Sequence, residues 1–143
     1  MTGGQETDAG GTYTLLIERT EGGPLEVGAL GSLSFPSGWY AYTGSALGSG
    51  GFSRVDRHER VAAGEHDVRH WHVDYLLGAP GTQLDHVVRS AGVDIECAVA
   101  DAVAGSRVPE FGSSDCDCES HLAFYPDRAA LLDSVDRAHR ANR

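Results

Sequence analysis

Apolar and polar residues alternate along several short stretches of the chain, and this pattern is typical of β-strands. TYTLLIE is rich in β-branched and aromatic residues and is followed by the polar turn RTEGGP. A break at Pro36 and Gly38 divides the next extended stretch into two. In HWHVDYLL, aromatic and aliphatic residues alternate with histidine and aspartate. Strands are therefore predicted at residues 12–18, 25–35, 38–44, 70–77 and 83–90.

Helical periodicity marks three other segments. In FSRVDRHERVAA, Phe52, Val55 and Ala62 have the spacing of residues that pack inward from a helix. IECAVADAVAG is alanine-rich and acidic at its start, and DRAALLDSVDRAHRA follows Pro126 with Asp127 as its N-cap. Helices are therefore predicted at residues 52–63, 95–105 and 127–141. This order of elements predicts an α+β fold, in which a small, largely antiparallel β-sheet is flanked by helices.

The length of 143 residues fits one domain with one core. Residues 1–10 are polar and rich in glycine, so we expect a disordered tail there and a single domain over 11–143 that ends in a helix. The sequence has no apolar run of about 18 residues and no signal peptide at its start. A cytoplasmic protein without a membrane partner is expected.

The charge balance changes the picture of possible partners. The chain has 21 acidic residues against 11 basic ones, all of them arginine, and a net charge of −10. Taken alone, this charge argues against nucleic acid, because lysine and arginine supply most of the affinity for phosphates. An acid-rich, lysine-free composition is also typical of halophilic, haloarchaeal-type proteins, whose charges are screened over about 3 Å in molar salt. We favour the second interpretation, in which global charge does not exclude DNA.

Three short motifs follow one another in a characteristic order: GTY at 11–13, YTG at 42–44 with SA after it, and R-x-x-R-H at 54–58. Together they resemble the GIY-YIG nuclease superfamily. The wider layout over residues 11–125 looks most like a family of small archaeal and bacterial GIY-YIG-like proteins. That family is catalogued as a domain of unknown function and is sometimes fused to endonuclease III-type repair enzymes. The resemblance implies a GIY-YIG-like fold and a metal-dependent DNA endonuclease.

The resemblance assigns roles to five residues. Tyr13 and Tyr42 match the motif tyrosines, which orient or deprotonate the attacking water, although a nearby cation must help a phenol with a pKa of about 10 to act as a base. Arg54 matches the arginine that holds the scissile phosphate, and His58 lies one turn later on the same helix face. Glu96 matches the acidic ligand of Mg²⁺ or Mn²⁺.

Each role has a structural alternative. The tyrosines are good strand residues that could simply pack in the sheet. Arg57 and Arg60 are expected to contact flanking phosphates, and pairing with Asp56 and Glu59 on a solvated helix face is an equal alternative. Glu96 could be an ordinary glutamate in a first helical turn, where the helix dipole favours it.

The sequence departs from the resembled family at three points. Threonines stand between the glycine and tyrosine of both motifs, and LGSGG lengthens the loop before Arg54. The asparagine near the end of many such domains has no counterpart, because Asn142 is the only asparagine. Ser114 or Asp115 could take its place.

A second candidate site lies in DCDCESH, where Cys116, Cys118 and His121 form a C-x-C-x-x-H motif. Two thiolates and an imidazole suit a structural Zn²⁺, with His70 or His72 as a possible fourth ligand. The alternative is a turn with two free thiols. The third cysteine, Cys97, leaves an odd number without an export signal, which argues against a disulfide framework.

Two functions therefore remain open. The first is an endonuclease acting on branched, nicked or damaged DNA, with a base-excision repair glycosylase as a possible partner. The second is a non-catalytic module that binds nucleic acid or zinc on the same fold. The nuclease requires Tyr13, Tyr42, Arg54 and Glu96 to converge, whereas a Glu96 side chain turned into the core would favour the module.

Overall fold

The computed structural model describes residues 10–28, 31–46, 51–65, 72–108 and 120–142. The strands are β1 (Gly11–Arg19), β2 (Gly23–Glu26), β3 (Ser32–Phe35), β4 (Gly38–Ser45), β5 (Thr82–Ala91), β6 (Ser106–Arg107) and β7 (Leu122–Tyr125). The helices are α2 (Ser53–Ala62), α3 (His72–Leu77), α4 (Glu96–Ala102) and α5 (Arg128–Asn142). None of these helices is both long and apolar enough to cross a bilayer.

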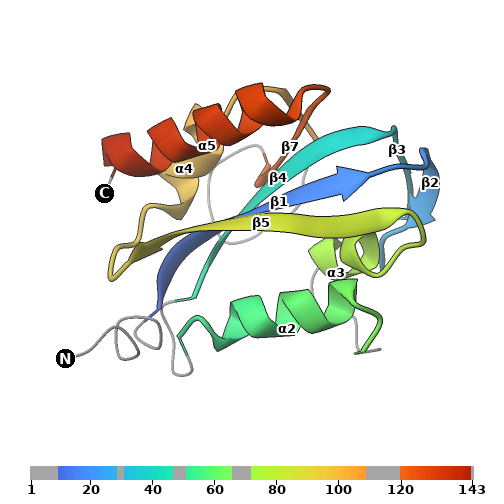
Figure 1. Ribbon diagram of the computed structural model, residues 1–143, viewed down its shortest axis with the longest axis horizontal. Coiled ribbons are helices and arrows are strands. Elements are labelled where there is room, and N and C mark those ends of the chain that lie inside the picture. Colours follow the sequence, from blue (N-terminus) through green and yellow to red (C-terminus); the bar gives the residue numbers. More distant parts are fainter. Residues whose placement is uncertain (1–9, 29–30, 47–50, 66–71, 109–119, 143) are drawn as a thin grey trace.

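The central feature is a five-stranded antiparallel sheet in the order β5-β1-β4-β7-β6, beside a separate β2–β3 hairpin. Helices α2 and α3 cover one face of this sheet and α4 and α5 cover the other (Figure 1). Because side chains alternate along a strand, β1 serves both layers: Leu15 and Ile17 pack toward α2 and α3, and Leu16 packs toward α4 and α5. The α+β fold predicted from the sequence is confirmed.

The prediction of a strand at residues 70–77 is wrong. From His72 onward this segment forms α3, and Val73, Leu76 and Leu77 are fully buried in the core. Their spacing of three and four residues is that of a helical stripe, and a run this short also fits alternation. The sequence analysis also missed β7, the strand that joins β4 to the β6 edge of the sheet.

The predicted tail at residues 1–10 lies outside the described residues except for Gly10. This glycine is buried, and its carbonyl accepts a hydrogen bond of 2.8 Å from the backbone N–H of Gly92. A Cβ at Gly10 would lie 2.0 Å from the carbonyl oxygen of Ala46. Gly10 therefore belongs to the folded domain.

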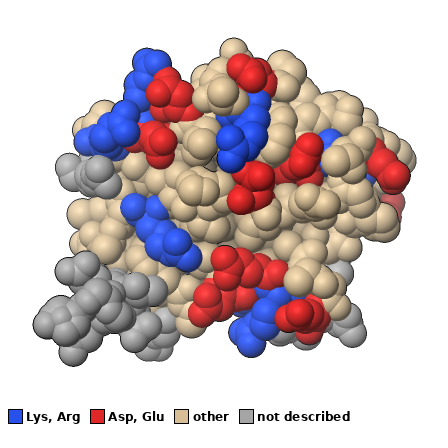
Figure 2. All heavy atoms as spheres, in the orientation of Figure 1, with Lys and Arg blue, Asp and Glu red and all other residues tan. Residues whose placement is uncertain are grey.

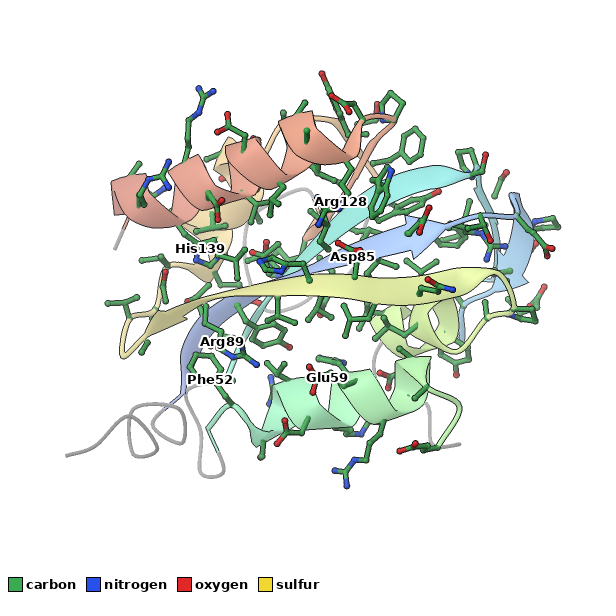
Figure 3. The ribbon with its side chains drawn as sticks, viewed as in Figure 1. Phe52, Glu59, Asp85, Arg89, Arg128 and His139 are labelled. Carbon is green, nitrogen blue, oxygen red and sulfur yellow. The ribbon has the colours of Figure 1, made fainter. Side chains whose placement is uncertain are left out.

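Helix α5 is fixed to the sheet through a buried polar contact. The ring of His139, 1 % exposed, points from α5 toward the sheet (Figure 3). Its Nε2 lies 2.8 Å from the Thr14 hydroxyl on β1, and its Nδ1 lies 2.8 Å from the Ser90 hydroxyl on β5. Thr14 also shares a hydrogen bond of 2.9 Å with Thr43 on β4. One helix residue thus ties three neighbouring strands together on the α4–α5 side.

Replacing His139 by alanine should lower the free energy of unfolding by about 2–4 kcal/mol, because two buried hydroxyls lose a partner and a cavity remains. Urea denaturation at constant molar KCl measures this change. Arg140→Ala, an exposed neighbour on the same helix, is the control and should stay within about 0.5 kcal/mol of the parent. Equal stability of both variants would contradict the role given to His139.

Candidate functional site

The two motif strands lie side by side, and their tyrosines share one face. Strands β1 and β4 pair antiparallel, with Tyr13 opposite Gly44 and Leu15 opposite Tyr42. Tyr13 and Leu15 are two residues apart, so both tyrosines point toward α2 and α3. A Cβ at Gly44 would lie 2.6 Å from the Tyr13 hydroxyl oxygen. The glycine of the YTG motif is therefore needed to make room for the tyrosine of the GTY motif.

Helix α2 brings His58 against these tyrosines. His58 is buried on the helix face that also carries Val55 and Val61. Its Nε2 lies 2.8 Å from the Tyr13 hydroxyl oxygen, a buried hydrogen bond between residues 45 positions apart. The ring centroid of His58 is 5.6 Å from that of Tyr13 and 6.3 Å from that of Tyr42. Three of the predicted catalytic residues are thus in one cluster.

Asp74 joins this cluster from α3, and the sequence analysis did not identify it. Its carboxylate is fully buried and accepts two hydrogen bonds of 3.1 Å from the Arg57 guanidinium. The Asp74 Oδ1 also lies 3.7 Å from Nδ1 of His58. Arg57, expected at flanking phosphates or in a surface ion pair, is instead held against an interior carboxylate. The available signal was that Asp74 falls on the apolar stripe of α3, three residues before Leu77, once HVDYLL is taken as a helix.

Arg54 connects the end of β4 to the tyrosines. It is half-buried near the start of α2, and its Nη1 donates a hydrogen bond to the carbonyl oxygen of Ser45. Its positive charge also acts on the Tyr13 phenol. Arg54 therefore lies near the phenol while part of its side chain still faces solvent.

Glu96 begins α4, as predicted, and it is not turned into the core. Its side chain is 23 % exposed, and Oε2 lies 3.1 Å from Nδ1 of the buried His121. The Thr12 hydroxyl places this helix by donating to the carbonyl of Val93, at 2.9 Å, and accepting from the N–H of Ile95, at 3.0 Å. The threonine of the GTY motif thus positions the segment that leads into Glu96.

A partly exposed carboxylate fits a hard divalent cation, because Mg²⁺ binds few protein oxygens and keeps several waters. Among the described residues, no three His, Cys, Asp or Glu side chains are arranged to hold a metal. Cys116 and Cys118 of the predicted zinc motif lie outside the described residues, as do Ser114, Asp115, His70 and the side chain of His72. The zinc site therefore stays a prediction, and of its members the structure places only His121, against Glu96.

Burial dominates the electrostatics of the cluster. It raises the pKa of Tyr13 well above 10, with a further increase from Tyr42, while the charge of Arg54 offsets part of the shift. Burial likewise raises the pKa of Tyr42, and Glu96 raises it further. The pKa of His58 is lowered from 6.5 by burial, against the opposing effect of Asp74. The Arg54 cation thus lowers the pKa of Tyr13, as a cation that helps the phenol act as a base should, but burial outweighs it.

A groove of about 690 Å³ lies between α2 and β5, outside this cluster. Arg89 lines it and lies 5.6 Å above the ring of Phe52 (Figure 3). Glu59 and Asp85 also line it, so the groove carries both signs of charge. Figure 2 shows arginines interspersed with acidic side chains on this face rather than gathered in one basic patch. Arg60 is exposed on α2, and its contact with phosphates stays a prediction.

Comparison with known proteins identifies the family of this chain. The family model described as domain of unknown function DUF123 matches residues 12–143. No curated protein and no solved structure matches the chain. The matched range contains the whole cluster and Glu96.

The tyrosines of the cluster should resist alkaline ionisation. Since the folded pKa of Tyr13 and Tyr42 exceeds the unfolded value of about 10, their stabilising contribution is complete below pH 10 and is lost as the pH rises above it. Tyr40, whose pKa burial raises to about 12, should behave in the same way. Near-ultraviolet phenolate absorbance, followed together with circular dichroism, should show these three ionising only as the fold is lost. Ionisation of Tyr13 near pH 10 in an intact fold, assigned with Tyr13→Phe, would contradict this.

Proposed function

We propose that this chain, which belongs to the DUF123 family, is a metal-dependent DNA endonuclease of the GIY-YIG type. The observation that carries the proposal is the Tyr13–His58 hydrogen bond of 2.8 Å, with the charge of Arg54 acting on the same phenol. A hydroxyl, a neutral base and a nearby cation are the groups that phosphodiester hydrolysis needs for water activation and charge stabilisation.

The geometry supports a proton relay rather than a free phenolate. Water attacks phosphorus, the new P–O bond forms, and the ester P–O bond breaks. The proton of the water passes to the Tyr13 oxygen while the Tyr13 proton passes to His58, so the phenol is neutral before and after the step. This route avoids ionising a buried tyrosine whose pKa is raised well above 10. The leaving oxygen takes its proton from solvent.

Arg54 and Glu96 supply the charges of the reaction in this proposal. The Arg54 guanidinium, half-buried and near Tyr13, would hold a phosphate oxygen and stabilise the charge that develops on it. Glu96 would hold Mg²⁺ or Mn²⁺ through its exposed carboxylate edge, and the bound cation would neutralise phosphate charge. Glu96 is close enough to raise the pKa of both tyrosines, which supports a single site.

The substrate we propose is a branched, nicked or damaged DNA structure rather than a base sequence. Sequence readout needs an element that enters a groove and contacts base edges. In the described part of the chain the helices flank the sheet, and the longest, α5, packs on it through its buried residues. A base-excision repair glycosylase stays a possible partner in this proposal.

One observation favours the second candidate function, a non-catalytic module. The contact of 3.1 Å between Glu96 and His121 gives the carboxylate a structural partner. In that case Glu96 would join α4 to the start of β7, and the exposed arginines would serve only to bind nucleic acid. Glu96→Gln separates the two functions.

The test of the proposed function incubates the purified chain in about 2–3 M KCl, where its acidic surface is screened. The substrates are supercoiled plasmid, flap, junction, nicked and base-damaged DNAs, each with Mg²⁺, Mn²⁺ or chelator. Cleavage of at least one structured DNA that depends on the cation is expected. Binding without cleavage on every substrate would reject the nuclease in favour of the module.

Glu96→Gln should uncouple binding from cleavage. The change is nearly isosteric, and a first-turn carboxylate contributes only about 0.3–1 kcal/mol through the helix dipole, so the fold should persist. The cleavage rate should fall on the order of 10²–10⁴, while DNA affinity is retained. Asp94→Asn removes the same charge two residues away and is the matched control, expected to cut like the parent. An unchanged rate for Glu96→Gln would exclude its metal role.

Tyr13→Phe tests the relay from the other end. It keeps the ring in the core but removes the hydroxyl that His58 contacts and on which the charge of Arg54 acts. Single-turnover cleavage should slow on the order of 10²–10⁴, and the free energy of unfolding should drop by about 1–3 kcal/mol. Tyr40 lies on the same face of the sheet, on β4, and its hydroxyl donates to the Pro36 carbonyl instead. Tyr40→Phe should therefore retain activity. If both variants cut equally well, Tyr13 takes no part in the chemistry.

A further inference from the structure

Behind His58 lies a buried ion pair whose place in the fold sequence analysis did not anticipate. The Arg57 side chain is 14 % exposed and the Asp74 side chain is fully buried. Two parallel hydrogen bonds of 3.1 Å join them, the arrangement that holds a guanidinium and a carboxylate in one fixed orientation. The carboxylate presented in this way faces Nδ1 of His58.

The hydrogen-bond donors and acceptors around Tyr13 indicate which nitrogen of His58 is protonated. The positive charge of Arg54 acts on the Tyr13 oxygen and favours a lone pair rather than a proton on that side of the phenol. The Tyr13 proton then needs an acceptor, and His58 Nε2 lies 2.8 Å away. If Nε2 carried the proton instead, His58 would donate to the phenol oxygen and the buried phenolic proton would lose this acceptor.

The opposite side of the ring leads to the same tautomer. Nδ1 lies 3.7 Å from Oδ1 of Asp74, longer than the limit of about 3.2 Å for a good N–H···O bond. At this distance an N–H directed at the carboxylate is still attracted, whereas an unprotonated nitrogen would point its lone pair at a negative charge. Contacts of this kind are often long before substrate binds and shorten during the reaction.

We propose that Asp74, held in place by Arg57, is a positioning residue that keeps the proton of His58 on Nδ1, so that Nε2 accepts the proton of Tyr13. The mechanistic part of this inference rests on the proposed nuclease function. The assignment of the His58 tautomer does not depend on that function. Arg57 thereby acts inside the site, not on the DNA.

This arrangement also stabilises the product of the proton transfer. When the Tyr13 proton moves to Nε2, His58 becomes an imidazolium with N–H groups on both sides. The Asp74 carboxylate then faces a positive charge, and its two hydrogen bonds from Arg57 hold it in that orientation. Within the described residues, the charged and titratable groups that act on His58 include Tyr13 of β1, Tyr42 of β4, Arg54 and Arg57 of α2, and Asp74 of α3.

Nitrogen NMR of the ¹⁵N-histidine-labelled full chain, in molar KCl, reads the tautomer directly. In the parent, His58 should show a protonated Nδ1 and an unprotonated Nε2. In Asp74→Asn the amide can donate to Nδ1, so the proton should move to Nε2 and the contact with Tyr13 should reverse its direction. A parent His58 protonated on Nε2, or an Asp74→Asn variant with an unchanged tautomer, would overturn the proposal.

The pH titration of His58 supplies a second readout, in which two variants should shift the pKa of His58 in opposite directions. Asp74 raises the pKa of His58 and Arg57 lowers it. Asp74→Asn should therefore lower the His58 pKa, and Arg57→Gln should raise it. Leu77→Ala is the matched control, because it removes buried volume from the same helix without touching a polar group and should leave tautomer and pKa unchanged. If Asp74→Asn is too unstable to study, Arg57→Gln decides: a His58 pKa equal to that of the parent would overturn the proposal.

The cleavage assay separates this inference from the proposed function. On a DNA that the parent cuts, Asp74→Asn should lose a factor on the order of 10²–10⁴ in rate with unchanged DNA affinity, as expected for a histidine in the wrong tautomer. A variant with the shifted tautomer that cuts as fast as the parent would overturn the positioning role. If the parent cuts no DNA, the nuclease proposal fails, and the NMR result alone decides whether Asp74 fixes the tautomer.

Discussion

The hydrogen bond between Tyr13 and His58 is the contact on which the site depends, because both groups are buried and neither could lose its partner without cost. It requires α2 to lie flat against the sheet with His58 pointing inward. It also requires glycine at position 44, since a Cβ there would collide with the Tyr13 ring. The outer nitrogen of His58 then needs a polar neighbour, which α3 provides as Asp74, and a buried carboxylate needs a cation, which α2 provides as Arg57. Each of these residues follows from the one before it.

Strand β1 separates the buried polar side chains into two groups, one on each face of the sheet. On the α2–α3 side, Tyr13 contacts titratable groups that can exchange protons. On the α4–α5 side, Thr14 contacts His139 and Thr43, and that set holds α5 onto three strands. Thr12 then fixes the entry to α4 and so the place of Glu96. The threonines that differ from the resembled motifs are therefore accounted for by hydroxyl hydrogen bonds that aliphatic side chains could not make.

The parts of the fold that the sequence predicted are those whose periodicity is long and unambiguous. Strands β1, β4 and β5 and helices α2, α4 and α5 follow from alternation, helical spacing and the Asp127 cap, whose Oδ2 accepts from the N–H of Ala130 at 3.4 Å. The helix in segment 70–77 was mistaken for a strand, because a segment this short fits both the strand period and the helix period. The role of Asp74 was missed for the same reason. The contact partners of Arg57 and Glu96 could not be predicted at all, since Asp74 and His121 reach them through the tertiary fold from distant elements. The upward shift of the Tyr13 pKa likewise could not be predicted from the sequence, because the burial that causes it exists only in the folded chain.

The acidic composition and the cationic site are compatible because they lie at different depths. Surface charges separated by more than the Debye length of about 3 Å scarcely interact in molar salt, so a net charge of −10 has little effect on an approaching phosphate there. The Arg57–Asp74–His58 contacts are buried, and salt screens buried pairs much less than exposed ones. In the reaction we propose, proton transfer between Tyr13 and His58 would therefore depend on neighbours whose interactions keep their strength at high salt. Long-range attraction to DNA would be weak under those conditions, so the proposed nuclease would have to recognise its substrate by short-range contacts at the phosphate itself. A half-buried arginine already oriented by a backbone carbonyl, as Arg54 is, is suited to such contacts, because less side-chain entropy remains to be lost on binding.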